Sequence, residues 1–246
     1  MRPDEWERAG TRLSHAAIAL VVLVSFVTQV VLTVTGGADA NSGRVDAHIG
    51  VGERLVRLFS YFTVDSNLIV LGVAICLVLN PARNGVIWRV VWLDALLGIV
   101  ITGLVFDIVL APIVRLTGAA LWVTIGFHYV SPWLTLAAWL LFGPRQRIDW
   151  RTIGYAFIWP LAWIIYTFVH GAISGWYPYP FLDVGIHGYP VALRNTALVV
   201  LVAGVLALIF KALDARLPTV AGPSLGRRDP LRPLHQVAEP HPDEVH

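Results

Sequence analysis

The chain has 246 residues, of which 57% are hydrophobic and 14% are charged, and its net charge at pH 7 is +2. Soluble domains are about 45–50% apolar and about 25% charged, so this composition excludes an ordinary soluble domain. The only cysteine is Cys76, which excludes an intrachain disulfide and a cluster of thiolate metal ligands.

Six apolar stretches are each long enough to cross a bilayer, which takes roughly 20 residues. In chain order they cover about residues 13–35, 57–79, 89–111, 119–142, 152–171 and 191–213. A backbone in lipid must satisfy its own hydrogen bonds, so each stretch is predicted to be a helix. The predicted fold is an all-α, polytopic bundle of six transmembrane helices over residues 13–213. Gly98 and Gly103 in the third stretch predict close helix packing, either within the monomer or between subunits of a homo-oligomer.

The basic residues divide unevenly between the connecting segments. Thirteen of the 18 lysines and arginines lie on the side of the N-terminus and five on the other. The positive-inside rule therefore predicts a multi-pass plasma-membrane protein with both termini in the cytoplasm. Residues 1–12 are expected to be a cytoplasmic leader before a retained first span. The Pro-rich, charged segment 218–246 is expected to be a disordered cytoplasmic tail.

Aromatic residues and prolines crowd the loop between spans five and six, which reads GWYPYPFLD over residues 175–183. Prolines preset the backbone, and Trp and Tyr favour the membrane interface. We expect an ordered lid on the outer surface, made by Trp176, Tyr177, Tyr179 and Phe181. The alternative is an aromatic belt that only holds the protein at its depth.

A set of polar residues lies within spans two to five, each in the half of its span that is nearer the outer side. A carboxylate in hydrocarbon costs roughly 2.5–3.5 kcal/mol on insertion scales, so such groups usually have a function. Their similar depth predicts a pocket that opens toward the outer leaflet. Structural roles are the alternative: a threonine bonding its own helix, an amide or imidazole bonding across helices, or a paired carboxylate. The set is Thr63, Asp65, Asn67, Asp107, His128 and His170.

Two other expectations concern single residues of the spans. Asp94 lies toward the inner side and is expected to pair with Arg89 or another inner arginine. His170 is expected near the membrane interface, where placing a histidine costs little free energy. A structural role is therefore favoured for it, and a role in supporting the candidate site is the alternative.

Thr63 and His128 are candidates for a nucleophile and its base. A hydroxyl needs an adjacent base, and histidine titrates near neutral pH. Pro132 leaves the carbonyl of His128 without a donor, which predicts a kink there. Asn67 or Asp107 is expected to orient the imidazole or to support an oxyanion.

Other enzyme classes have no support in the sequence, which contains no G-x-S-x-G, no H-E-x-x-H and no Gly-rich phosphate loop. We therefore predict no metal, no cofactor and no nucleic-acid partner. The distribution of the lysines and arginines is explained by the orientation of the spans in the membrane and does not indicate a nucleic-acid site.

Three short segments together carry a resemblance to a family. They are Tyr-Phe-Thr at 61–63 with Ser-Asn-Leu at 66–68, His-Tyr-Val-Ser-Pro at 128–132, and GWYPYPFLD at 175–183. They resemble the androgen-induced, FAR-17a-like family of six-span membrane proteins, as a bacterial member, and the resemblance covers spans two to six. The third segment is the most specific: it is similar to the family's G-x-W-V-Y-P-F-L-E stretch, with an additional proline.

The resemblance implies a function, because animal members hydrolyse fatty acid esters of hydroxy fatty acids with an intramembrane threonine and histidine. By that resemblance Thr63 is the nucleophile and His128 the base. The expected activity is hydrolysis of a lipid-like ester that enters from the outer leaflet among membrane lipids. Two rivals remain. One is a small-molecule or proton transporter, with the aspartates and histidines lining a polar path, and the other is a non-catalytic membrane scaffold.

Overall fold

A computed structural model describes residues 3–46, 48–145 and 147–217, and this part of the chain is helical without a β-strand. The predicted tail at 218–246 lies outside the described residues. The elements are α1 (Pro3–Thr35), α2 (Val51–Leu58), α3 (Phe62–Leu79), α4 (Val86–Val105), η1 (Phe106–Leu110), α5 (Gly118–Thr124), η2 (Ile125–Val130), α6 (Ser131–Phe142), α7 (Trp150–Ala156), α8 (Ile158–Ser174), η3 (Pro180–Leu182) and α9 (Val184–Arg216).

Within the described residues, six helical segments are long and apolar enough to cross a membrane, which confirms that part of the prediction. Their ends differ from those predicted. The first helix begins at Pro3, so most of the segment expected as a separate leader continues the same helix. The last helix begins at Val184 and contains a break at Gly188, where φ is +75°. Polar and charged residues such as Glu, Arg, Lys and Asp extend both helices because most of them are compatible with a helix.

The second predicted span begins too early. Residues 51–58 form the separate helix α2, and α3 starts only at Phe62. The reason lies in the sequence VGERLVRL, whose charged and apolar residues fall on opposite faces of a helix. Its charged face is satisfied locally, because Arg57 pairs with Asp46 at 3.1 Å and with Glu53 at 2.5 Å.

Two helices contain π-helical segments, η1 at the end of α4 and η2 between α5 and α6. The predicted irregularity near Pro132 takes this form. Ser131 donates its backbone N–H to the carbonyl of Gly126, five residues earlier, in place of the usual four. Such bulges occur often at functional sites, and this one contains His128.

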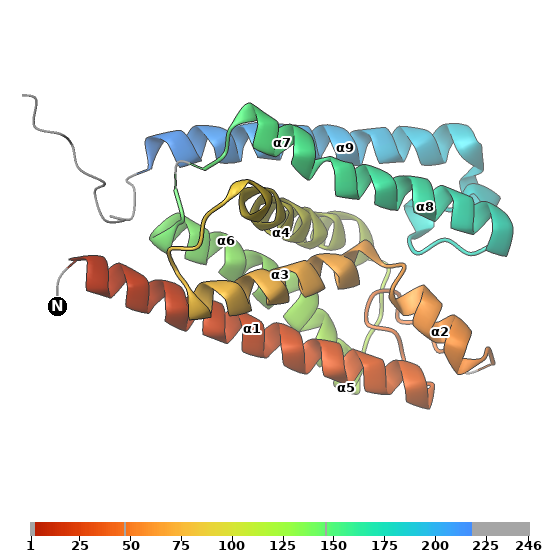
Figure 1. Cartoon of the computed structure of the whole chain (residues 1–246). Coiled ribbons are helices and arrows are strands. Elements are labelled where there is room, and N and C mark those ends of the chain that lie inside the picture. The colour runs from red at the N-terminus through yellow and green to blue at the C-terminus, as the bar shows by residue number, and fades with distance from the viewer. Residues whose placement is uncertain (1–2, 47, 146, 218–246) are drawn as a thin grey trace, which may run out of the picture.

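The third apolar helix, α4, is the centre of the bundle. Its Leu93, Leu96 and Ile99 are almost completely buried. Figure 1 shows α1 and α3 on one side of α4, and α7, α8 and α9 on the other. The loop of residues 175–183 connects α8 to α9, and we call the end of the bundle that carries it the loop end.

Both glycines of α4 meet neighbouring helices inside the monomer. A Cβ atom on Gly98 would lie 3.0 Å from Ser66 Oγ of α3, and one on Gly103 would lie 2.9 Å from Pro132 Cβ of α6. Of the two alternatives in the sequence, the structure therefore shows close packing within the monomer.

We predict that Gly103→Leu lowers the thermal stability of the protein in detergent, because the side chain pushes α4 away from α6. Overpacking of this kind costs about 1–3 kcal/mol. Gly72→Leu on α3 is the matched control, since a Cβ there meets no atom within 4 Å. Equal melting temperatures for the two variants would contradict this packing.

Candidate active site

Thr63 and His128 meet although 65 residues separate them. Thr63 lies in the first turn of α3 and His128 in η2, and Thr63 Oγ1 is 3.4 Å from His128 Nε2. Both side chains are buried, with exposed fractions of 3% and 0%. The structure thus brings together the two residues predicted as nucleophile and base. A contact of this length is common in ligand-free enzymes, where catalytic hydrogen bonds tighten when substrate binds.

The surroundings of His128 select one tautomer of its ring. Nδ1 lies 3.3 Å from the carbonyl oxygen of Thr124. A carbonyl only accepts, so Nδ1 carries the proton and Nε2 presents its lone pair to Thr63. The ring is also stacked on Phe106, with centroids 3.9 Å apart. The imidazole is oriented in the way a general base requires.

Tyr179 completes a chain of hydrogen bonds around Thr63. Its hydroxyl accepts the backbone N–H of Thr63 at 3.0 Å and lies 3.1 Å from Thr63 Oγ1. Because the Thr63 hydroxyl donates to His128, the phenol donates to Thr63 Oγ1. Burial raises the pKa of Tyr179 above its usual value, which keeps the phenol protonated as a donor.

The sequence identified Tyr179 only as a ring of the lid. Its contact with Thr63 joins residues 116 positions apart, and no local pattern signals such a contact.

The other aromatic residues of the loop pack into the loop end of the bundle. Trp176 lies edge-on to Tyr61 at 5.7 Å and under the guanidinium of Arg57 at 5.2 Å. Tyr177 occupies the space left by Gly171, where a Cβ would lie 2.2 Å from its ring. Phe181 stacks on Tyr179 at 5.4 Å. Most of the rings of the loop are buried in the bundle and do not lie on its surface, which corrects that part of the prediction.

Asn67 has a different place from the one expected. Its amide donates to the carbonyl of Thr63 at 2.9 Å and to that of Phe127 at 3.3 Å. Both amide hydrogens are therefore used, and neither reaches the imidazole. Asn67 ties the backbone that carries the threonine to the backbone beside the histidine.

The remaining predicted residues lie apart from the Thr63–His128 contact. The carboxyl group of Asp107 is beside the hydroxyl of Tyr129, so the expectation that Asp107 orients the imidazole is wrong. His170 stacks on Tyr166 and lies within hydrogen-bond distance of Ser174. Asp65 is half-buried and does not line the cavity next to Thr63.

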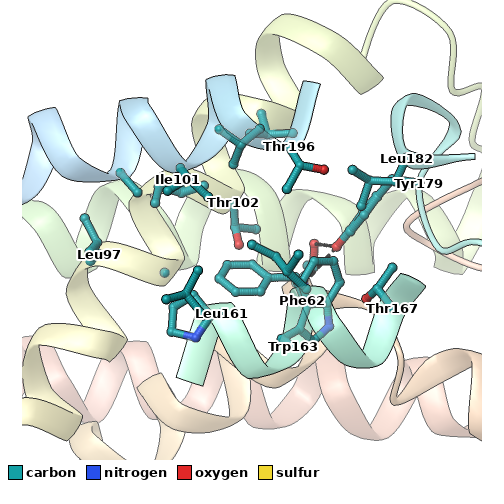
Figure 2. Close-up of a pocket in the computed structure, with 18 of the residues that line it drawn as sticks. Phe62, Leu97, Ile101, Thr102, Leu161, Trp163, Thr167, Tyr179, Leu182 and Thr196 are labelled. Carbon is teal, nitrogen blue, oxygen red and sulfur yellow. Dashed lines mark hydrogen bonds between the residues drawn. The ribbon is translucent and has the colours of Figure 1, made fainter. Parts of the chain in front are cut away.

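A cavity that is partly open to the surroundings lies against Thr63 and Tyr179, and the empty space within it and at its mouth amounts to about 940 Å³. Its walls come from α3, α4, α8, η3 and α9, and they are mostly apolar (Figure 2). Phe62, Leu97, Ile101, Leu161, Trp163, Phe181 and Leu182 are among the lining residues. Of the candidate pair only Thr63 lines this cavity, so His128 lies behind the threonine and away from the space a ligand would fill.

Asp94 also lines the cavity, which corrects the expectation of an arginine partner. Within the described part of the chain, Arg89 donates to Asn84 at 3.0 Å, and Asp94 Oδ1 is buried without a hydrogen-bond partner. The position of Asp94 along its apolar stretch suggested a partner among the inner arginines. Its side chain instead lies on the face of α4 that lines the cavity.

The described residues contain no group of three or more His, Cys, Asp or Glu side chains arranged to hold a metal ion. Comparison of the chain with models of protein families, with curated proteins and with solved structures finds no match. The chemical features of the site are therefore a hydroxyl, a neutral imidazole that faces it, a buried phenol and an adjoining apolar cavity.

We predict that Asn67→Leu lowers the free energy of unfolding in detergent by about 1–3 kcal/mol, because two buried side-chain hydrogen bonds, to the carbonyls of Thr63 and Phe127, are lost. Ser66→Ala is the matched control: the Ser66 hydroxyl is buried on the same helix but has no hydrogen-bond partner among the described residues. A loss of stability in Ser66→Ala as large as that in Asn67→Leu would contradict this role.

Proposed function

We propose that the protein is an intramembrane threonine hydrolase that cleaves a lipid-like ester. The observation that carries this proposal is the contact between Thr63 Oγ1 and the lone pair of His128 Nε2 at the wall of an apolar cavity. A hydroxyl becomes a nucleophile when an adjacent base removes its proton. A structural threonine would only need to bond its own helix.

The proposed reaction proceeds by acyl transfer in two halves. Thr63 Oγ1 attacks the ester carbonyl carbon, and its proton passes to His128 Nε2. The tetrahedral intermediate collapses, the C–O bond to the alcohol breaks, and the alcohol leaves with the proton from His128. A water molecule then gives a proton to His128 and attacks the acyl-threonine. The carboxylic acid is released and Thr63 regains its proton.

Tyr179 is suited to stabilise the oxyanion. Negative charge on the carbonyl oxygen is stabilised by donors fixed in place before the reaction. The phenol of Tyr179 and the backbone N–H of Thr63 already meet beside Oγ1. When Thr63 loses its proton and bonds to carbon, the phenol and this N–H become free to donate to the new oxyanion. This role replaces the one expected for Asn67 or Asp107.

The cavity supports a substrate with a long apolar chain. Lining residues of α4 run from Asp94 to Val105, which corresponds to about 16 Å of helix. An extended chain advances about 1.2 Å per bond, so this length accommodates roughly 13 bonds. The resemblance to the FAR-17a-like hydrolases agrees with such a substrate.

We further propose that the six apolar helices span the plasma membrane with both termini in the cytoplasm, as the distribution of basic residues favours. The loop end then faces outward, and the ester enters from the outer leaflet. Membrane lipids surround the protein, and the chemistry requires no cofactor.

A transporter remains the second candidate because Asp94 faces the same cavity as Thr63. Polar groups at two depths of one cavity are what a proton or solute path requires. Proton flux into proteoliposomes, lost in Asp94→Asn and kept in Thr63→Val, is the result expected of a transporter. A membrane scaffold would show neither flux nor ester cleavage.

We predict that Thr63→Val lowers kcat for a fatty-acyl ester about a thousandfold or more, because it removes the nucleophile at nearly constant volume. His128→Gln is expected to lose a similar amount, whereas Thr63→Ser keeps measurable activity. The assay is ester cleavage by protein purified in detergent. Mass spectrometry is used in parallel to detect an acyl group on Thr63, or a phosphonyl group after treatment with a fluorophosphonate. Thr28→Val is the control, since Thr28 bonds its own helix on the exposed face of α1. Full activity in Thr63→Val would exclude the hydrolase.

We predict that Tyr179→Phe lowers kcat about 10²–10³-fold with little change in KM, as expected when one oxyanion donor is lost. The ring and its packing remain, but the Thr63 N–H loses its acceptor, so the free energy of unfolding should fall by about 0.5–2 kcal/mol, as for the loss of a helix cap. Tyr177→Phe, in the same loop, is the matched control and should keep its activity. A Tyr179→Phe effect confined to KM would assign the phenol to substrate binding.

A further inference from the structure

A second pocket, lined by charged residues, lies at the loop end between α2 and the loop that joins α1 to α2. Arg44, Arg54 and Arg57 line it together with Asp39 and Asp46. The empty space within this pocket and at its mouth amounts to about 340 Å³. Arg44 is exposed and the other two arginines are partly exposed, so a ligand can reach these side chains. We call it the arginine pocket.

Both carboxylates of the arginine pocket already have partners. Asp46 pairs with Arg57 at 3.1 Å. Asp39 Oδ1 accepts hydrogen bonds from its own loop, from the N–H of Asn41 at 2.9 Å and from the N–H and the hydroxyl of Ser42 at 2.9 and 3.0 Å. These contacts hold the loop together, and only one of the two carboxylates neutralises an arginine.

Two arginines of the pocket are left without an acidic partner. Among the described residues, neither Arg44 nor Arg54 forms an ion pair. Arg54 donates to a neutral acceptor, the carbonyl of Val34, at 3.3 Å. With both aspartates ionised, the three arginines and two aspartates of the lining give a net charge of +1. The pocket is therefore suited to an anion.

The arginine pocket lies on the side of the bundle where basic residues are scarce. Only five of the 18 lysines and arginines belong to this side, and three of those five line the one pocket. In the proposed orientation this is the outer side, where the positive-inside rule disfavours arginine. Membrane topology therefore does not explain why these arginines are gathered here.

An apolar stripe on α1 begins at the edge of the pocket and runs away from the loop end. Its residues are three or four positions apart, so they share one face of the helix, and each is 46–63% exposed. They are Leu20, Val24, Val27, Val31 and Val34. Because Arg54 bonds to the carbonyl of Val34, its guanidinium lies at one end of the stripe, where α2 approaches the end of α1 (Figure 1).

The length of the stripe matches an acyl chain. The 14 steps from Leu20 to Val34 correspond to about 21 Å of helix at 1.5 Å per residue. One leaflet contains roughly 15 Å of hydrocarbon, half of the bilayer core. A chain that starts at the arginine pocket can therefore lie against the stripe over the whole depth of its leaflet.

We infer that the arginine pocket and the α1 stripe together bind an anionic phospholipid. Arg44 and Arg54 donate to its phosphate group, and its acyl chain lies along the stripe. Guanidinium groups suit this role because their planar donors match phosphate oxygens. Arg57 stays paired with Asp46. The site shares no lining residue with the cavity beside Thr63, so the inference goes beyond the proposed hydrolase and does not depend on it.

The surface favours an anionic lipid over two related ligands. A free phosphate ion would contact the arginines alone, whereas a lipid also covers the exposed stripe that begins beside them. A zwitterionic headgroup brings a cation of its own, which the net positive charge of the pocket repels. The ligand that satisfies both parts of the surface has a negative headgroup and a hydrocarbon chain.

The test measures lipid binding to the full chain in detergent by native mass spectrometry. Phosphatidylglycerol, phosphatidylcholine and diacylglycerol with identical chains are compared. Wild-type protein is expected to bind phosphatidylglycerol about tenfold or more tightly than diacylglycerol, with phosphatidylcholine between them. Arg44→Gln combined with Arg54→Gln should weaken phosphatidylglycerol binding about twentyfold, since each arginine near an anionic headgroup contributes about fivefold. Arg44→Lys with Arg54→Lys keeps the charge and should keep most of the affinity.

Arg194→Gln is the control variant. Arg194 belongs to the same side of the bundle but lies outside the arginine pocket, where it donates to Asn195 at 3.2 Å. Its loss should leave the affinity unchanged. Equal wild-type affinities for phosphatidylglycerol and diacylglycerol overturn the inference, as does an equal loss of affinity in Arg194→Gln and in the double glutamine variant. The wild-type comparison decides the matter even if the double variant does not fold.

Two further measurements on wild-type protein separate the lipid from a free anion. Phosphatidylglycerol with a photoreactive diazirine in its acyl chain should label residues 20–34 of α1 more strongly than the exposed residues of α8, such as Ile165 and Ile173. Equal labelling of the two helices contradicts a lipid on the stripe. Inorganic phosphate at the same concentration should raise the melting temperature far less than phosphatidylglycerol. An equal rise would assign the pocket to a free anion and overturn the lipid.

Discussion

The hydrogen bond between His128 Nδ1 and the carbonyl of Thr124 determines how the rest of the site is arranged. In an apolar interior a buried donor that lacks an acceptor costs free energy, so the arrangement in which each donor of this chain faces an acceptor is favoured. Because Nδ1 donates to Thr124, Nε2 must accept, Thr63 must donate to it, and the phenol of Tyr179 must donate to Thr63. One backbone carbonyl thereby sets the direction of every proton in the chain.

That chain of bonds continues beyond the histidine into the first loop. Thr124 Oγ1 donates to the carbonyl of Ala40 at 2.6 Å, and the N–H of Ala40 donates to Gln29 of α1 at 3.1 Å. The polar contacts thus cross the bundle from α1 to the loop before α9. The cavity for the chain lies beside them with mostly apolar walls. A polar network and an apolar cavity that meet at one hydroxyl suit an enzyme whose substrate is mostly hydrocarbon.

The sequence predicted the features that depend on composition and depth. Six apolar helices follow from run length, and the meeting of Thr63 with His128 agrees with their similar depth. Sequence reasoning did not predict features that depend on which face of a helix a residue occupies, or on contacts between residues far apart in the sequence. Asp94 was expected to pair with an inner arginine but lines the cavity, and η2 changes the helical phase next to His128. Tyr179 was predicted only as an aromatic residue of the lid, whereas its hydroxyl contacts Thr63, which lies 116 positions away in the sequence. The break before α3 was missed because a run of apolar residues hides a short amphipathic helix.

The bond from Thr63 N–H to Tyr179 has a consequence for how the loop and α3 move. The residue before α3, Tyr61, provides no side-chain cap, and the first N–H groups of any helix have no partner within it. Tyr179 therefore caps α3 from a distant part of the chain. The loop and the first turn of α3 are therefore coupled, because any movement of Tyr179 away from α3 removes this cap from the turn that carries Thr63. The hydroxyl of Thr63 is held in position from outside its own helix, by a residue of the loop.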